Sequence, residues 1–324
     1  MIAHENKQQM LYWADKMGIP VSELDDKMKF LQLNEVRIID LLPDMLVMVR
    51  SAIAEKTFSY RRKSIDIIKR GLLISFQNIF SHSSNKSSPG ARSLQEQPHV
   101  RITPLHLANE IKFPKGVNIR QISILIDLDH LKNFIGKGTH KFEYLFNDEK
   151  TLLIEEFMSP EMAAVVNEVA NISSAPILPE AYYKLKALEL IYLLFKNLSN
   201  RQDVPHRNLR NEEIEAVYRV RDKIATSFDQ PFTQNELVKI SGMNTLKLRK
   251  LFTQVFGKGI YEYYQFLRMQ EAARLMQQEH LSVSEAGYQL GFTNLSYFGR
   301  LFERHFGEKP KKWRSNLYPN AHTS

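Results

Sequence analysis

The chain has 324 residues, of which 43% are apolar and none is cysteine, so it is long enough for a large core or for two domains. The lack of cysteine excludes disulfides, thiolate zinc sites and cysteine nucleophiles, and it suits a reducing compartment. The first residues lack the basic-then-apolar order of a secretory signal, and no apolar run reaches the roughly 20 residues that span a bilayer. We therefore expect a cytoplasmic protein without a membrane segment.

The net charge of +8 is concentrated towards the C-terminus. Residues 205–324 contain 18 Lys and Arg against 12 Asp and Glu, which leaves a net charge of only +2 for the first 204 residues. An excess of positive charge favours a polyanionic partner, although it also serves solubility alone. The charge distribution therefore makes nucleic acid a candidate partner for the last third of the chain.

Short apolar runs rich in Val, Ile and Phe occupy the region from about residue 28 to 127. The clearest runs cover residues 36–39, 45–49, 72–79 and 122–126. Such runs favour strands, and the polar stretch SHSSNKSSPGARS at residues 81–93 favours a mobile loop between them. Several short strands separated by such turn-forming stretches predict a small, cupin-like β-barrel or a sandwich. Four aromatic residues of this region line either a ligand cavity or the core: Phe58, Tyr60, Phe76 and Phe80.

The apolar spacing changes to a helical period after Pro160. We expect a short helix at residues 128–135, then a first longer helix after Pro160 and a second, more apolar one at residues 182–198. A helix this apolar needs cover on most sides, from the barrel, from its neighbour, or from the same helix of a second subunit. Polar residues with one proline follow, so we place a linker at residues 201–210. It separates an N-terminal domain of residues 1–200 from a C-terminal domain of residues 211–318.

Two short helical segments in the C-terminal domain begin with the same motif. Thr233 is followed three residues later by Glu236, and Ser282 is followed three residues later by Glu285. Both pairs are capping boxes, in which the hydroxyl and the carboxylate satisfy the free backbone donors at the start of a helix. A short helix of one or two turns is therefore predicted after each pair.

Each short helix is followed by a glycine turn and a longer helix. Gly242 and Gly291 stand where the backbone has to turn left-handed. The longer helices read NTLKLRKLFTQVFG and NLSYFGRLFERHFG, and we align them at an offset of fifty residues, so the unit is duplicated. Short helix, turn and longer helix is the order of a helix-turn-helix, whose second helix enters the DNA major groove.

Helical spacing assigns the two longer helices an inner and an outer face. The inner face consists of Leu248, Leu251, Phe252 and Val255 in the first unit and of Phe298, Leu301, Phe302 and His305 in the second. The outer face consists of Leu246, Arg249, Lys250 and Thr253 in the first unit and of Tyr297, Arg300 and Arg304 in the second. A basic face is usually only solvated, but its duplication with matching caps favours DNA binding. Residues 259–277 predict a connecting helix of about 19 residues, hence roughly 28 Å, against about 34 Å between successive major grooves.

Residues from about Val217 to Trp313 resemble the C-terminal DNA-binding domain of the AraC/XylS family of transcriptional regulators. The most specific part is AGYQLGFTNLSYFGRLFERHFGEKPKKWR, residues 286–314, although Trp313 stands where tyrosine is commoner in the family. The resemblance implies base contacts at Leu246, Arg249 and Lys250 in the first unit and at Ser296, Tyr297 and Arg300 in the second, with Lys247 and Asn294 at the DNA backbone. Gly299 departs from this pattern, since a glycine inside a helix costs about 1 kcal/mol relative to alanine.

The same resemblance implies an α+β chain in which a barrel that binds a small-molecule effector is followed by dimerising helices. We therefore expect a homodimeric activator, with double-stranded DNA and RNA polymerase as partners and without a metal or cofactor. Control by a protein partner in place of an effector is the first alternative. An enzymatic barrel fused to the DNA-binding domain is the second, but the sequence contains no His-Glu-x-x-His, Gly-x-Ser-x-Gly or Walker motif, so we expect no enzyme.

Overall fold

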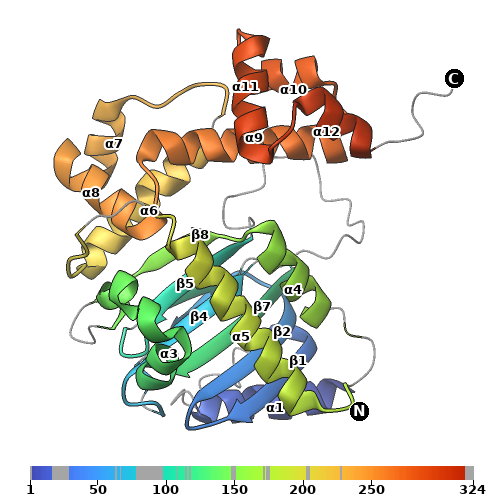
Figure 1. Ribbon diagram of the computed structural model, residues 1–324, viewed down its shortest axis with the longest axis vertical. Coiled ribbons are helices and arrows are strands. Elements are labelled where there is room, and N and C mark those ends of the chain that lie inside the picture. The colour runs from blue at the N-terminus through green and yellow to red at the C-terminus, as the bar shows by residue number, and fades with distance from the viewer. Residues whose placement is uncertain are drawn as a thin grey trace, which may run out of the picture. The chain divides into compact units, whose positions relative to one another are not determined.

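The structure is a computed structural model in which the chain forms two compact units, with their boundary between Arg210 and Asn211 (Figure 1). It describes residues 2–16, 29–62, 64–65, 67–77, 98–107, 109–113, 115–116, 118–146, 151–170, 172, 176–201, 205–226 and 228–317. The expected loop at residues 81–93 lies outside these ranges, as does Phe80.

The N-terminal unit combines eight described strands with helices at its start and end. It begins with α1 (Ile2–Lys16), β1 (Leu31–Leu41), β2 (Met45–Ala54), β3 (Phe58–Arg62), β4 (Gly71–Gln77), β5 (His99–Pro104), β6 (Asn109–Phe113) and β7 (Asn118–Asp127). It continues with α3 (Leu128–Ile135), the 3-10 helix η2 (Gly136–Leu145), β8 (Ile154–Phe157), α4 (Pro160–Ala170) and α5 (Pro179–Leu198). The three expected helices and the expected strands at residues 36–39, 45–49 and 122–126 are confirmed, and the one at 72–79 is confirmed to Gln77, where the described range ends. The expected end of the strand region near residue 127 is wrong, because β8 follows it.

Six of these strands form one antiparallel sheet in the order β1-β2-β7-β4-β5-β8, and β3 pairs with β6 in a separate ribbon. In the part of the chain that the structure describes, the edge strands β1 and β8 do not pair with each other, so the sheet is open. The closed, cupin-like barrel expected from the sequence is therefore not what the described strands form. Other elements cover both faces of the sheet, so closure is not required to bury its apolar residues.

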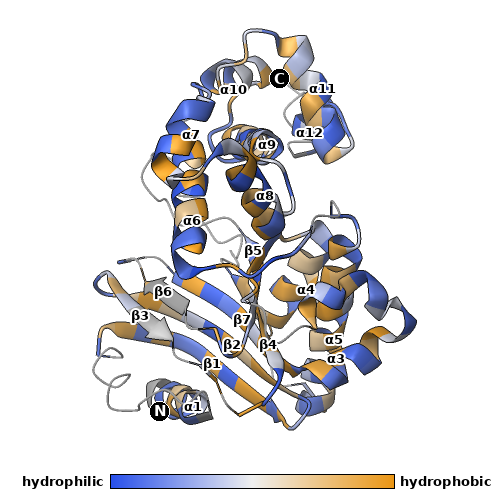
Figure 2. Ribbon diagram, turned by 90° about the vertical axis from the view of Figure 1, so that its left-hand side faces the viewer, coloured by the Kyte–Doolittle hydropathy of each residue, from blue (hydrophilic) through white to orange (hydrophobic). Residues whose placement is uncertain are grey.

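Alternate residues of each strand point to opposite faces of the sheet, and each face has its own cover (Figure 2). Met45, Val47 and Val49 of β2 belong to the core beneath α3, α4 and α5. Leu46 and Met48 belong to a second core with α1 and the β3–β6 ribbon. Both cores are apolar, which explains why these strands read as continuous apolar runs in the sequence.

Helix α5 is covered on one side only. Its inner face packs on the first core, and the buried residues are Tyr183, Ala187, Leu190, Ile191, Leu194, Phe195 and Leu198. Leu178, Leu185 and Tyr192 remain 69%, 67% and 61% exposed. Of the three covers expected for this helix, the sheet and the neighbouring α4 are found, and the outer apolar stripe has no cover within the described part of this unit.

The last described residues of the N-terminal unit are held against it. Leu209 N donates to Thr151 O (3.1 Å), and Thr151 N donates to Asn208 Oδ1 (2.9 Å). The ring of His206 stacks on Tyr144 with centroids 3.8 Å apart. The predicted linker at residues 201–210 is therefore attached to the first unit by its second half, while residues 202–204 lie outside the described ranges.

The C-terminal unit is helical. It consists of α6 (Asn211–Ala225), α7 (Gln234–Ser241), α8 (Thr245–Phe256), α9 (Ile260–Gln278), α10 (Val283–Gln289), α11 (Leu295–Phe306) and α12 (Pro310–Leu317). The pairs α7–α8 and α10–α11 have the expected helix-turn-helix order, and α9, which is 19 residues long, runs between them (Figure 1). No described helix of either unit is long and apolar enough to cross a membrane.

Candidate nucleic-acid interface

Local hydrogen bonds fix the start and the turn of the first helix-turn-helix, α7–α8. Glu236 N donates to Thr233 Oγ1 (3.3 Å) and Thr233 N donates to Glu236 Oε2 (2.8 Å), which is the predicted capping box. The hydrogen bond from the Thr233 backbone lowers the pKa of the Glu236 carboxyl. Gly242 ends α7 with a φ of 66°, and Asn244 Oδ1 accepts a hydrogen bond from Lys247 N (2.9 Å) to start α8.

The second unit, α10–α11, begins in the same way, and its turn leaves no room for a side chain. Glu285 N donates to Ser282 Oγ (3.2 Å), and Ser282 N donates to Glu285 Oε2 (2.7 Å). Gly291 has a φ of 74°, and a Cβ at this position would lie 2.4 Å from the carbonyl oxygen of Asp229. Both the backbone angle and the close approach therefore require glycine in this turn.

The two units are not related by one constant offset. Thr233 and Ser282 are 49 positions apart, whereas Asn244 and Asn294 are 50 apart, because Thr293 adds one residue to the second turn. The offset of fifty that aligns the longer helices therefore does not extend to the capping boxes.

Only the N-terminal half of α8 is open to solvent. Its four predicted inner residues are all buried: Leu248, Leu251, Phe252 and Val255. Leu246, Arg249 and Lys250 are exposed, as predicted. Thr253 was expected on the same outer face but is only 8% exposed, so that prediction is wrong. The cause is that every residue from Leu251 to Phe256 is buried, with the rings of Tyr218 on α6 and Tyr263 on α9 against Phe256.

Helix α11 presents a longer outer face. Asn294 Oδ1 accepts a hydrogen bond from Tyr297 N (2.9 Å) and starts the helix. The exposed residues include every predicted contact of this unit: Asn294, Ser296, Tyr297, Arg300 and Arg304. On the inner face Phe298 and Phe302 are fully buried, whereas Leu301 and His305 are half-buried. The expected inner face is confirmed.

Lys247 is the one predicted contact residue whose charge is already engaged. Its Nζ lies 2.9 Å from Oε1 of Glu213, a carboxylate on α6 that is only 4% exposed. The pair ties the first turn of α8 to α6, and removal of the lysine would leave a buried charge without this partner. Lys247 therefore links the start of the reading helix to α6 from a half-buried position.

The two reading faces are chemically different. At the offset of fifty, Lys250 corresponds to Arg300, but Arg249 corresponds to Gly299. Arg304 is exposed, whereas its counterpart Gln254 is 2% exposed. The first unit therefore carries its cations near the N-terminus of the helix, and the second spreads them over two turns.

Two residues of α9 hold the second unit in place. Arg268 is 8% exposed, donates to the carbonyl oxygen of Leu290, and lies over the Phe292 ring with Cζ 3.7 Å from its centroid. Burial lowers the pKa of Arg268. Gln270 Nε2 lies 2.8 Å from His305 Nε2, which connects α9 to α11. These residues hold the turn and the reading helix against the connecting helix.

Helix α12 closes the second unit. Trp313 packs edge-on against Phe302, with centroids 5.5 Å apart. Arg314 Nε donates to the carbonyl oxygen of Leu281 (3.0 Å), just before the capping box. Trp313 was named from the sequence only as a departure from the family pattern, and Arg268 was missed. The sequence does contain a signal for Arg268, because it is a basic residue between two apolar ones in the connecting helix. The structure shows that these neighbours, Leu267 and Met269, are buried.

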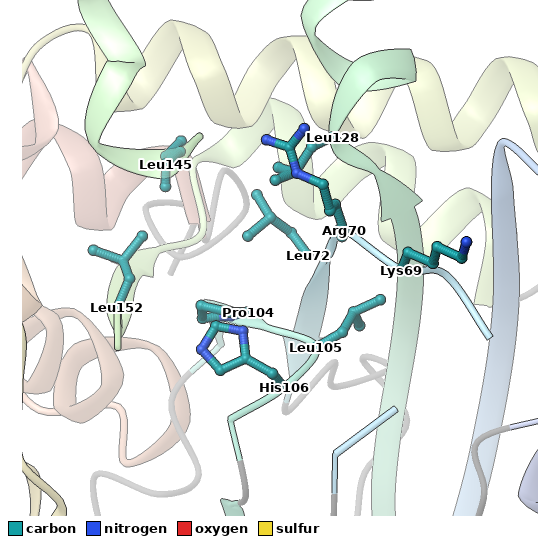
Figure 3. Close-up of a pocket in the computed structure, with 10 residues that line it drawn as sticks. Lys69, Arg70, Leu72, Pro104, Leu105, His106, Leu128, Leu145 and Leu152 are labelled. Atoms are coloured by element: carbon teal, nitrogen blue, oxygen red, sulfur yellow. The ribbon is translucent and has the colours of Figure 1, made fainter. Parts of the chain in front are cut away.

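Two of the aromatic residues that the sequence assigned to a ligand cavity or to the core of the N-terminal unit are packed against other side chains. Phe76 is fully buried in the core under the helices, and Phe58 stacks on Phe113. The side chain of Tyr60 lies outside the described ranges. A pocket lined by leucines and by Lys69, Arg70 and His106 lies between the start of β4, η2 and the end of β5 (Figure 3).

Two capped helix-turn-helix units on one connecting helix, each with an exposed basic reading face, define a DNA-binding domain of the double helix-turn-helix class. Comparison with known proteins agrees, because residues 237–316 match the family described as "Helix-turn-helix domain". The probable transcription factor PqrA of Proteus vulgaris is 31% identical over 96 residues, which is 28% of this chain and 79% of that protein. The chain belongs to the AraC/XylS family of transcriptional regulators.

The similarity is confined to the C-terminal part. The HTH-type transcriptional regulator GlxA of Rhizobium meliloti is 30% identical over 99 residues, which is 31% of this chain and 31% of that protein. The match thus spans about a third of the length of the first curated relatives. Among solved structures, a probable AraC family transcriptional regulator from Rhodopseudomonas palustris is 27% identical, with 32% of this chain and 97% of that chain covered and a TM-score of 0.30.

Proposed function

We propose that the chain is a sequence-specific transcriptional regulator that places α8 and α11 in two adjacent major grooves of double-stranded DNA. The observation that carries the proposal is the pair of capped units with exposed basic faces, joined by one helix of 19 residues. At 1.5 Å per residue this helix is about 28 Å long, comparable with the roughly 34 Å between successive major grooves on one face of B-DNA.

Each exposed side chain then has a role that suits its chemistry. Arg249, Lys250 and Arg300 donate to guanine or hold phosphate, Leu246 meets a thymine methyl group, and Ser296 and Tyr297 contact base edges. Asn294 and Arg304 lie at the DNA backbone, and Lys247, in the first turn of α8, helps to hold the same backbone. The exposure of these residues, apart from half-buried Lys247, supports the assignment.

We further propose a cytoplasmic activator that works with RNA polymerase and whose N-terminal unit binds a small-molecule effector. It acts as a homodimer through α5. Leu185 and Tyr192 of α5 are exposed and stand seven positions apart, which is the heptad repeat of a two-helix seam, and Leu178 is exposed just before the helix begins. A second copy of the same helix fits this stripe, because a two-fold interface needs a surface that complements itself.

The test is selection of bound sequences from a random duplex library with the purified chain. The proposal predicts enrichment of one bipartite site, and Arg300→Ala should lower affinity for it by about 1–3 kcal/mol with little change on random DNA. Lys223→Ala, an exposed cation on α6, is the matched control and should bind normally. Equal loss on both DNAs would make Arg300 a phosphate contact, and no enrichment at all would contradict the proposed function.

A further inference from the structure

A row of polar side chains crosses the face of the sheet that lies opposite α3, α4 and α5. Arg50 of β2 donates from Nη2 to Gln121 Oε1 on β7 (2.7 Å), and Gln121 Nε2 donates to Ser123 Oγ (2.7 Å). Ser123 Oγ lies 3.5 Å from Ser75 Oγ on β4. Ser75 and Ser123 are 3% and 1% exposed. The row continues the face whose other half is the apolar core beneath α1.

Arg50 is buried without a counter-charge. It is 5% exposed, and no carboxylate in the described part of the chain pairs with it. Its Nε is fully buried and has no hydrogen-bond acceptor. Burial lowers the pKa of Arg50 to about 10. A buried cation without a counter-charge is expensive, so its presence needs a compensating interaction.

Arg101 shows that this face accommodates a paired arginine equally well. It lies on β5 on the same face as Arg50 and donates to Glu155 Oε1 of β8 through Nε (2.9 Å) and Nη2 (2.7 Å). Glu155 is itself 5% exposed. The absence of such a carboxylate near Arg50 among the described residues is therefore a property of that position rather than of the sheet face.

The surroundings of Arg50 indicate the class of anion. A guanidinium has five N–H donors in a planar fork that matches a carboxylate, and Arg50 uses only one nitrogen on a described protein group. Its Cζ lies 5.3 Å from the centroid of the Phe113 ring, which in turn stacks on Phe58 at 4.8 Å. A cation beside an aromatic pair suits a carboxylate attached to an apolar body.

We propose that Arg50 anchors the effector of the N-terminal unit, and that this effector is a small organic carboxylate with an apolar or aromatic body. The regulatory meaning of this site rests on the proposed function, whereas binding itself does not. The pocket of Figure 3 is a weaker candidate, because its cationic residues Lys69 and Arg70 are both exposed to water, which weakens their attraction for an anion.

The test compares melting temperatures of the full chain with benzoate and with benzamide, and with hexanoate and hexanamide, which differ mainly in charge. At ten times the dissociation constant a bound carboxylate should raise the melting temperature by roughly 3–6 °C, and its neutral amide should not. Arg50→Met should abolish the carboxylate-specific rise. It should also melt at or above the temperature of the unliganded wild type, because it removes a buried, unpaired charge.

Arg101→Met is the matched control: it should lower the melting temperature by removing the two hydrogen bonds from Arg101 to the buried Glu155, yet keep the carboxylate-specific rise. The proposal is overturned if neither carboxylate stabilises the wild type more than its amide, or if the rise persists in Arg50→Met. It is also overturned if Arg50→Met melts several degrees lower, since Arg50 is then structural. These measurements contain no DNA, so their failure and a failure of DNA binding are separate results.

Discussion

His305 links the second reading helix to the connecting helix as an uncharged ring. It is half-buried, and its Nε2 lies 2.8 Å from the Gln270 amide. The Phe266 ring packs edge-on against it, with centroids 4.6 Å apart. Burial, and to a lesser extent the charge of Lys258, lowers its pKa to about 4. The ring is therefore neutral at pH 7 and accepts charge only at the expense of this contact.

The free energy of unfolding should decrease as the pH is lowered, because His305 is harder to protonate in the folded chain than in the unfolded one. An unfolded histidine has a pKa of about 6.5, so between about pH 6.5 and 4 the unfolded chain binds more protons than the folded one. Stability is then full above this window and is lost as the pH falls through it. At pH 5 the loss should be about 1–2 kcal/mol after allowance for the exposed part of the ring.

The measurement is urea denaturation of the wild type and of His305→Gln at pH 7 and pH 5. Glutamine keeps a hydrogen-bonding group but does not titrate, so the variant should lose less stability by about that amount. An identical loss in the two proteins would show that His305 does not carry the pH dependence.

Replacement of Gly299 tests whether a residue with a higher helix propensity makes α11 more stable. A Cβ at this position would meet no atom within 4 Å, and the helix is continuous from Leu295 to Phe306. Gly299→Ala should therefore raise the free energy of unfolding by about 0.5–1 kcal/mol, because it restricts the unfolded chain and strains nothing in the folded one.

Gly291→Ala is the matched control, and its Cβ would collide with the Asp229 backbone at 2.4 Å, so it should destabilise the chain. Urea denaturation of both variants measures the two changes in the free energy of unfolding. If Gly299→Ala were as destabilising as Gly291→Ala, the open surroundings described for Gly299 would be incorrect.

The exposed stripe of α5 predicts a dimer that charge can disrupt. In sedimentation at micromolar concentration the wild type should be a dimer, and Leu185→Glu combined with Tyr192→Glu should be a monomer, because four like charges would face each other in the seam. Lys184→Glu lies on the same helix beside the stripe and should leave the dimer intact. A wild type that sediments as a monomer with and without DNA would contradict this role of α5.

The sequence predicted the elements of the C-terminal unit better than those of the N-terminal unit, for a physical reason. Caps, glycine turns and helical spacing are local, so Thr233, Ser282 and the two glycine turns were readable one by one. The closed barrel was not confirmed, because strand order depends on contacts between distant residues, and strands buried on both faces have similar apolar runs whatever their neighbours. Helix α1 was missed although Met10, Trp13 and Ala14 form a narrow buried stripe.

The candidate site was predictable where exposure follows from helical spacing, and not where tertiary contacts decide. Arg249, Lys250, Tyr297 and Arg300 are exposed as their spacing indicated. Thr253 is buried because α6 and α9 enclose the end of α8, and Lys247 is paired because Glu213 lies on another helix. Neither neighbour can be read from the local sequence.

At the scale of the whole molecule, the chain is a basic DNA-binding unit preceded by a unit that offers two further surfaces. One is the polar row around Arg50 and the other is the outer stripe of α5. The second half of the linker is hydrogen-bonded to the N-terminal unit at Thr151, so few residues separate the two units.

The central claim is that α9 holds two reading helices at a fixed distance on one face of DNA. It is tested most directly by the affinity of the purified chain for its selected bipartite site and for the same site with about 5 base pairs inserted between its halves, which turns them to opposite faces. The account predicts at least a tenfold loss of affinity, only partly recovered when a full turn of about 10 base pairs is inserted, because α9 cannot lengthen. Affinity that is unchanged by the half-turn insertion would contradict it.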